Sequence, residues 1–218
     1  MGQICSSESF VEPLETLTAD QLTASLTLVG TYLSKKRTTF TLVTVGGAIN
    51  TLYLRSRSTT HDVDFFSRTL TYEEIELLRK ATAEASIKLG APERWLNNQT
   101  SVFLQHDVRL RLVQEAADAN EVIFSSGGLI ILAAPWRYSL CSKLDRIHAA
   151  NTDPTKYRTY DMSDAVAYLR RLTEKNNGAI ECSQIEGWLE EFGFAGSDII
   201  PSLKEEFMKV YGSEGVTG

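Results

Sequence analysis

Two aspartates one residue apart, Asp62 and Asp64, have the clearest potential for chemistry in this sequence. The apolar residues Val63, Phe65 and Phe66 around them predict a β-strand, in which the two carboxylates share one face. Neighbouring carboxylates repel each other unless they share a cation, and hard oxygen ligands suit Mg²⁺ carried in by nucleotide phosphates. For a D-x-D pair considered alone, two solvated acids at a strand end are the alternative interpretation.

A pair of glycines precedes the aspartates in the chain. Residues 40–45 are apolar and β-branched, they stop at Gly46-Gly47, and residues 48–54 regain helical character. A glycine turn lets the backbone approach a ligand closely, and the start of a helix favours phosphate. The glycine pair is weak evidence by itself, but its order before the D-x-D strand favours a nucleotide site.

This order of elements resembles the nucleotidyltransferase superfamily of the DNA polymerase beta type, whose pattern is an apolar strand, Gly-Gly or Gly-Ser, a helix and D-x-D on the next strand. Within it, the sequence is most similar to the AbiEii-like toxins and related uncharacterised nucleotidyltransferase-like domains. The first motif matches at Gly46, Gly47, Arg57, Thr60, Asp62, Asp64, Phe65 and Phe66. The resemblance spans about residues 40–172, and its later matches are Trp95-Leu96-Asn97, Lys143-Leu144 and Asp161-Met162-Ser163-Asp164, with Tyr160 where a basic residue is expected.

The resemblance implies a metal-dependent nucleotidyltransferase that moves an NMP from an NTP to a hydroxyl acceptor on a protein or small molecule. Asp62 and Asp64 would hold Mg²⁺ (or Mn²⁺), and the nucleotide would be bound by Gly46, Gly47, Arg57, Thr60 and Lys143. Asp161 and Asp164 would orient Lys143 or cap a helix, and capping is the favoured role. The alternative is a catalytically inactive protein of the same fold that binds a nucleotide, a small ligand or a protein partner.

Active members of the superfamily carry a third carboxylate on a neighbouring strand, and Asp107 is the candidate for that catalytic role here. Residues 108–112 alternate apolar and basic side chains, which predicts a half-buried strand. Asp107 would then share a face with Arg109 and Arg111 at the start of this strand. If Arg109 faces the metal site instead, its cation replaces the metal and catalysis is lost.

The fold class predicted from these elements is α+β, a nucleotidyltransferase-type mixed β-sheet core with packed helices and a helical C-terminal part. Helices are expected over residues 18–36, with Gly30 as a weak point, and from a capping box at Thr71 to Gly90. Residues 95–105 are expected to form a short helix or turn. Two further strands are expected at residues 121–125 and 129–133 around a Gly127-Gly128 turn, and four C-terminal helices near residues 140–148, 162–172, 182–192 and 203–211.

The domain organisation follows from these elements. Residues 1–14 are predicted to be a flexible leader, residues 15–134 the core, and residues 135–213 a helical part of the same folding unit. Residues 214–218 are predicted to be a tail that frays.

Composition narrows the function classes. The 218 residues carry 28 acidic and 22 basic side chains, so the net charge of −6 gives no overall positive field for nucleic acid. The tryptophans have apolar neighbours without interleaved basic residues, which predicts core anchors rather than base-stacking platforms.

Three widely spaced cysteines indicate neither a disulfide framework nor a zinc site. With no apolar run near the roughly 20 residues of a membrane helix and no secretory signal, a cytoplasmic location is predicted.

The amino terminus carries a lipidation pattern. Gly2 followed by Ser6 matches the pattern for myristoylation, and Cys5 is placed for palmitoylation beside it. Both modifications together would attach the protein peripherally to a membrane surface, because one acyl chain gives only marginal binding. The alternative is an ordinary leader in which Gly2 is accidental.

Overall fold

The computed structural model describes residues 14–218, and a mixed five-stranded sheet in the order β5-β4-β2-β7-β6 organises them. Its strands are β2 (Phe40–Val45), β4 (Val63–Phe66), β5 (Leu96–Asn97), β6 (Val122–Ser126) and β7 (Leu129–Ala133). The central strand β2 runs antiparallel to β4 and parallel to β7, and β5 runs parallel to β4. The α+β class is confirmed.

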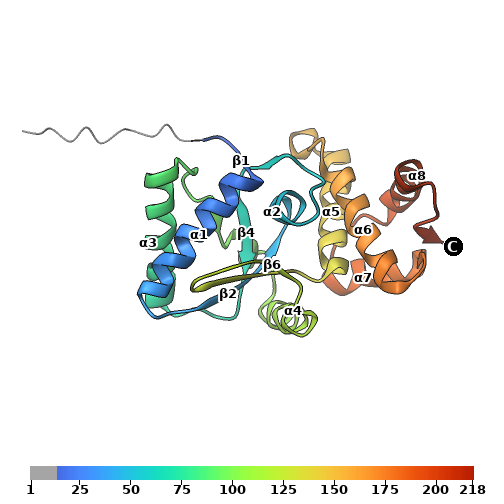
Figure 1. Cartoon of the computed structure of the whole chain (residues 1–218). Helices are drawn as coiled ribbons and strands as arrows, with labels where there is room; N and C mark the ends of the chain where they lie inside the picture. The colour runs from blue at the N-terminus through green and yellow to red at the C-terminus, as the bar shows by residue number, and fades with distance from the viewer. Residues whose placement is uncertain (1–13) are drawn as a thin grey trace, which may run out of the picture.

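Two long helices, α1 (Ala19–Lys35) and α3 (Tyr72–Leu89), cover one face of the sheet (Figure 1). Each begins at a capping box, at Thr18 with Gln21 and at Thr71 with Glu74, because the threonine hydroxyl and the partner side chain satisfy backbone N–H groups reciprocally. Their apolar faces pack on Val63, Phe65 and the other strand residues that point to this side. The fully buried Trp95 belongs to this core, as predicted.

The opposite face of the sheet is covered by α4 (His106–Ala119), in which Leu112 and Ala116 pack against the strands. The strand predicted over residues 108–112 was therefore wrong. Val108, Leu112 and Ala116 recur every four residues, so the same segment also fits one face of a helix. The helical pattern extends over more residues than the strand pattern, and the segment forms a helix. Asp107 lies exposed in the first turn of α4 rather than at the start of a strand.

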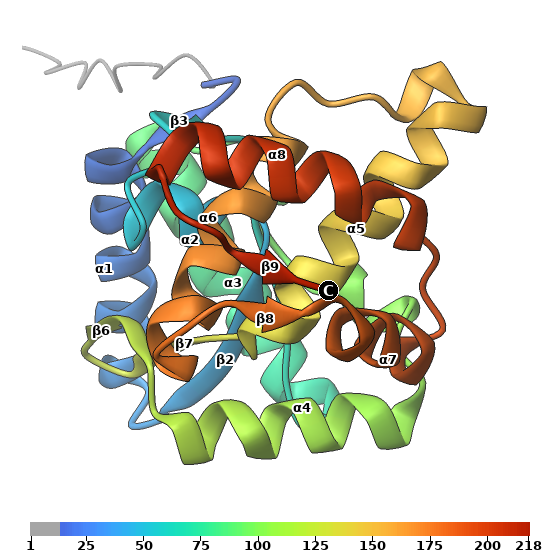
Figure 2. The ribbon, with the colours of Figure 1, turned by 90° about the vertical axis from the view of Figure 1, so that its right-hand side faces the viewer.

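A second group of helices follows the sheet and packs on α2 (Gly47–Leu52) (Figures 1 and 2). It contains α5 (Trp136–Thr152), α6 (Asp161–Asn176), α7 (Cys182–Phe192) and α8 (Ile200–Tyr211). Ile49 of α2 and Ala133 of β7 belong to the hydrophobic cluster of this group, which ties it to the sheet.

Several short elements complete the fold. They are β1 (Leu17–Thr18), β3 (Thr59–Thr60), β8 (Ile180–Glu181), β9 (Val216–Thr217) and the 3₁₀ turns η1 (Gln99–Val102), η2 (Pro154–Lys156) and η3 (Ser197–Ile199). The fraying predicted for residues 214–218 was wrong, because Val216 is buried and pairs with Ile180. A pairing of two residues with a distant strand leaves no periodic signal in the sequence.

No helix within residues 14–218 is long and apolar enough to span a bilayer. The lipidation sites predicted at Gly2 and Cys5 lie outside the described residues, and their acylation stays a prediction.

Candidate functional site

One edge of the sheet brings the glycine turn and the two aspartates together. Because β2 and β4 are antiparallel, with Val45 opposite Asp64, the end of β2 and the beginning of β4 meet at the same edge. Gly46 and Gly47 follow β2 directly, and Asp62 immediately precedes β4. The structure therefore places the predicted glycine and carboxylate motifs side by side.

The carboxylates of Asp62 and Asp64 are half-buried, and neither forms an ion pair within residues 14–218. Burial and the neighbouring charge of Asp62 raise the pKa of Asp64 from 3.8 to about 6. Burial also raises the pKa of Asp62. The amide of Asn97 is the direct polar partner, since its Nδ2 donates to Asp62 Oδ2 at 3.4 Å. Two desolvated carboxylates on one face are the arrangement that a bound cation stabilises.

The substitution Asp64→Asn should stabilise the metal-free protein at neutral pH. Folded Asp64 keeps its proton up to a pH of about 6, whereas the unfolded residue releases it near 3.8, so wild-type stability falls as pH rises through this window. The asparagine does not titrate, so the variant should gain about 2–3 kcal/mol over the wild type above pH 6 and almost nothing below pH 4. Urea unfolding across this pH range measures the difference.

Saturating Mg²⁺ provides the control for this prediction, because a cation bound by the carboxylates should shrink the advantage of Asp64→Asn. A difference between variant and wild type that stays constant between pH 4 and pH 7 would contradict the assignment.

The two glycines of the turn allow neighbouring groups to lie close to the backbone. Gly46 has a φ of +74°, in the region that favours glycine, and its carbonyl oxygen accepts a hydrogen bond of 3.0 Å from the Tyr168 hydroxyl. A Cβ at Gly47 would lie 2.4 Å from Thr60 Oγ1 and 2.8 Å from Arg57 Nη1. Glycine at this position therefore lets Thr60 and the Arg57 guanidinium lie directly against the turn.

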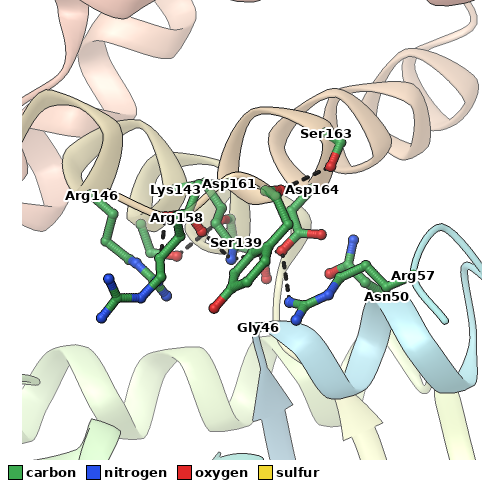
Figure 3. A network of polar contacts seen from close by, with 12 residues as sticks. Gly46, Asn50, Arg57, Ser139, Lys143, Arg146, Arg158, Asp161, Ser163 and Asp164 are labelled. Atoms are coloured by element: carbon green, nitrogen blue, oxygen red, sulfur yellow. Dashed lines mark hydrogen bonds and ion pairs between the residues drawn. The ribbon is translucent and has the colours of Figure 1, made fainter. Parts of the chain in front are cut away.

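A buried lysine in α5 forms the centre of an ion-pair network (Figure 3). Lys143 Nζ lies 2.9 Å from Asp161 Oδ1 and 2.8 Å from Asp164 Oδ2, and all three side chains are almost fully buried. Arg57 extends the network from the glycine turn to Asp164 at 3.4 Å, and Arg146 approaches Asp161 at 3.3 Å. This network, defined by Lys143, Asp161, Asp164, Arg57 and Arg146, joins the helical part to the sheet edge.

The capping role favoured for Asp161 and Asp164 was wrong. The N-cap of α6 is Tyr160, which makes no side-chain capping bond, and both aspartates face Lys143 instead. Tyr160 contacts the network through a cation–π interaction, because the Arg57 guanidinium lies 3.7 Å from the centre of its ring. A basic residue at this position would stand where the aromatic ring now contacts a cation.

The place beside Asp64 on the neighbouring strand is occupied by Asn97. The two residues are partners in the parallel pairing of β4 and β5, so their side chains lie on the same face. Within residues 14–218, no group of three or more His, Cys, Asp and Glu side chains is arranged to hold a metal ion. Asp107, in the first turn of α4, does not stand on the neighbouring strand where the third carboxylate was expected.

Arg146 and Tyr168 were missed in the sequence. Arg146 lowers the pKa of both Asp62 and Asp64 against the larger effect of burial. The single hydroxyl proton of Tyr168 is shared between two acceptors, the carbonyl oxygen of Gly46 and Oδ1 of Asn50 in α2. Arg146 lies one helical turn after Lys143, and Tyr168 lies one turn after Asp164. Helical spacing from Lys143 and Asp164 is therefore the signal that could have identified Arg146 and Tyr168.

The charges of the site are suited to a metal-bound anion. Asp62, Asp64 and the ion-pair network together contribute four carboxylates and three cations. A divalent cation on the aspartates would turn this excess of one negative charge into one positive charge. One oxygen of the fully buried Asp164, Oδ1, has no hydrogen-bond partner in the described part of the chain.

Comparison with known proteins identifies one family. The family model for a "Domain of unknown function (DUF7582)" matches residues 14–214, which is nearly the whole chain. No curated protein and no solved structure matches significantly.

Proposed function

This chain belongs to the DUF7582 family, and we propose that it is a metal-dependent nucleotidyltransferase acting at the sheet edge formed by the glycine turn and the two aspartates. The substrate is an NTP with Mg²⁺ or Mn²⁺, and the acceptor is a hydroxyl group on a protein or small molecule. The observation that carries the proposal is the pair of half-buried carboxylates without a cation partner in residues 14–218, adjacent to a glycine turn and Arg57.

In the proposed reaction, the oxygen of the acceptor hydroxyl forms a bond to the α-phosphorus while the bond from that phosphorus to the pyrophosphate breaks. Pyrophosphate leaves and the hydroxyl proton passes to solvent. Asp62 and Asp64 would hold the metal, which when bound neutralises phosphate charge. Gly46 has open space where a side chain would stand, so phosphate would approach the backbone there, and Arg57, which lies against Gly47, would compensate its negative charge.

Lys143 has a different role from the one first expected. It is buried and paired with two aspartates, so it holds α5 and α6 together at the site rather than offering a free charge to a phosphate. Its contribution to the function is to position Asp164, which in turn holds Arg57 at the turn.

A second candidate function is nucleotide binding without transfer. The observation that favours it is Asn97, a neutral amide at the position next to Asp64 where active relatives of the proposed superfamily carry a carboxylate. In this form the protein would bind the metal and nucleotide and leave the acceptor unmodified.

Thermal unfolding with each NTP, in the presence and absence of Mg²⁺, tests the shared first step. A nucleotide at about ten times its Kd should stabilise the folded protein by about 1.4 kcal/mol. We expect this stabilisation only with both metal and nucleotide, because the carboxylates repel the triphosphate when no cation lies between them. Release of pyrophosphate in the presence of a hydroxyl acceptor then separates transfer from binding.

Two variants control this experiment. Asp62→Asn should abolish the metal-dependent stabilisation, whereas Asp107→Asn, an equal change at an exposed residue of α4, should respond like the wild type. If no NTP produces a metal-dependent shift in the wild type, both proposed functions fail at this site.

A further inference from the structure

A large apolar groove lies between α3 and the β5 edge of the sheet. Its volume is about 930 Å³, and its apolar lining includes Phe65, Leu70, Ile75, Leu78, Ile87 and Leu96. This volume falls within the usual range of small-molecule sites, which are mostly apolar with a few placed polar groups.

The polar side chains of α3 that line the groove are already satisfied within the helix. Thr82 donates to the carbonyl oxygen of Leu78 at 2.9 Å, and Ser86 donates to that of Thr82 at 3.3 Å. Arg79 is engaged by Glu76 on the same helix. The α3 side of the groove therefore offers an occupant mainly apolar contact.

The groove and the aspartate pair meet at one residue. Asn97 lines the groove, and its Nδ2 donates to Asp62 Oδ2. The next residues, Asn98 and Gln99, also line this end and are exposed.

Phe65 and Leu96 line the groove from the α3 face of the sheet, whereas the side chains of Asp64 and Asn97 point to the opposite face. The polar end of the groove therefore reaches the outer strand β5 at Asn97, and an occupant's end must pass around this strand to reach the aspartates.

We propose that this groove binds the aliphatic part of a hydroxyl-bearing amphipathic small molecule, with its hydroxyl end at Asn97. The inference rests on the proposed function, because it makes this molecule the acceptor of the NMP. The aliphatic residues carry the choice of ligand class, since Leu and Ile predominate among the apolar side chains of the lining and Phe65 is the one aromatic residue there. The polar residues of the lining include the charged Glu93 and Arg94, beside the end that carries Asn97.

The exposure of the rim residues agrees with such an occupant. Ile75 is 43% exposed and Ile87 is 78% exposed, and both would lose contact with water when an alkyl chain lies in the groove. Since the gain is proportional to the apolar area covered, affinity should increase with chain length, roughly fourfold for each added methylene.

Dodecanol and hexanol are the probes for this proposal. Binding is measured by calorimetry without nucleotide or metal, so that it does not depend on the transfer site. Dodecanol should bind much more tightly than hexanol, and Ala83→Glu, which introduces a charge on the groove side of α3, should weaken dodecanol binding at least tenfold. Lys80→Glu is the control, because Lys80 is exposed on α3, does not line the groove, and its substitution changes the charge of the helix by two rather than one.

Each outcome bears on a different part of the proposal. Equal affinities of the two alcohols, or equal effects of the two glutamate variants, would overturn the groove as the binding site. Dodecanol that binds but receives no NMP from a wild type that modifies glycerol would overturn its role as the acceptor. Tighter dodecanol binding after deletion of residues 2–13 would show that the chain's own N-terminal segment is the occupant instead. Dodecanol binding by a wild type that shows no metal-dependent shift with any NTP would leave the groove as a binding site and overturn only its link to transfer, which separates failure here from failure of the proposed function.

Discussion

Lys143→Met is expected to lower the free energy of unfolding by about 3–5 kcal/mol, as is typical when one partner of a buried ion pair is removed. The lysine is 2% exposed and lies within 3 Å of a carboxylate oxygen of both Asp161 and Asp164. Without the lysine, only Arg57 and Arg146 remain to compensate the negative charges of the two buried carboxylates. Urea unfolding at neutral pH measures the loss.

A double variant separates charge from packing in this prediction. Adding Asp164→Asn to Lys143→Met should recover part of the stability, because Asp161 keeps Arg146 and the fully buried carboxylate of Asp164 is gone. The control Arg146→Met removes a cation that is 46% exposed and should cost less than about 1 kcal/mol. A double variant no more stable than Lys143→Met alone would show that the loss came from packing and not from uncompensated charge.

Most helices and strands could be predicted because their signals are local. The capping boxes at Thr18 and Thr71, the run of residues 40–45 and the Gly127-Gly128 hairpin each identify an element from neighbouring residues alone. The aspartate pair belongs to the same class, because the period of a single strand places both carboxylates on one face.

Elements whose pattern fits two periods, or depends on distant contacts, could not be predicted in this way. Residues 108–112 satisfy strand and helix spacing equally, and α4 forms because Leu112 and Ala116 find the open face of the sheet. Gly30, predicted as a weak point of the first helix, is instead a contact point. A Cβ there would lie 2.0 Å from the carbonyl oxygen of Ser126, so glycine lets the β6–β7 hairpin approach α1.

The parts of the site that were misjudged are those assembled across the fold. Asp161 and Asp164 stand at the start of a helix, where capping is the ordinary expectation. The other role considered for them, contact with Lys143, is the one that the ion pairs show, and no local pattern favoured it. The same holds for Asn97, whose significance comes from its register opposite Asp64 on another strand. Sequence spacing identifies candidate ligands, whereas pairing between strands decides which of them share a site.

The substitution Asn97→Asp is expected to increase the rate of NMP transfer, because residue 97 lies opposite Asp64 in the pairing of β4 and β5. A carboxylate opposite Asp64 and next to Asp62 would complete a set of three acidic ligands on one face of the sheet. We expect NMP transfer to increase about a hundredfold or more, which is the lower end of the contribution of a well-placed base. Pyrophosphate release under saturating NTP and Mg²⁺ measures the rate.

The same variant makes a second, opposite prediction for the metal-free protein. Three carboxylates in contact repel one another, so Asn97→Asp without Mg²⁺ should be less stable than the wild type and should gain more stability when Mg²⁺ is added. Asn98→Asp adds the same charge at the next, exposed residue and should change neither the rate nor the metal response. If Asn97→Asp gains metal-dependent stability but no transfer, the site binds nucleotide without the geometry for catalysis, and the second candidate function stands. If the wild type already transfers NMP as fast as the variant, Asn97 does not limit the reaction, and the acceptor hydroxyl loses its proton without help from a third carboxylate.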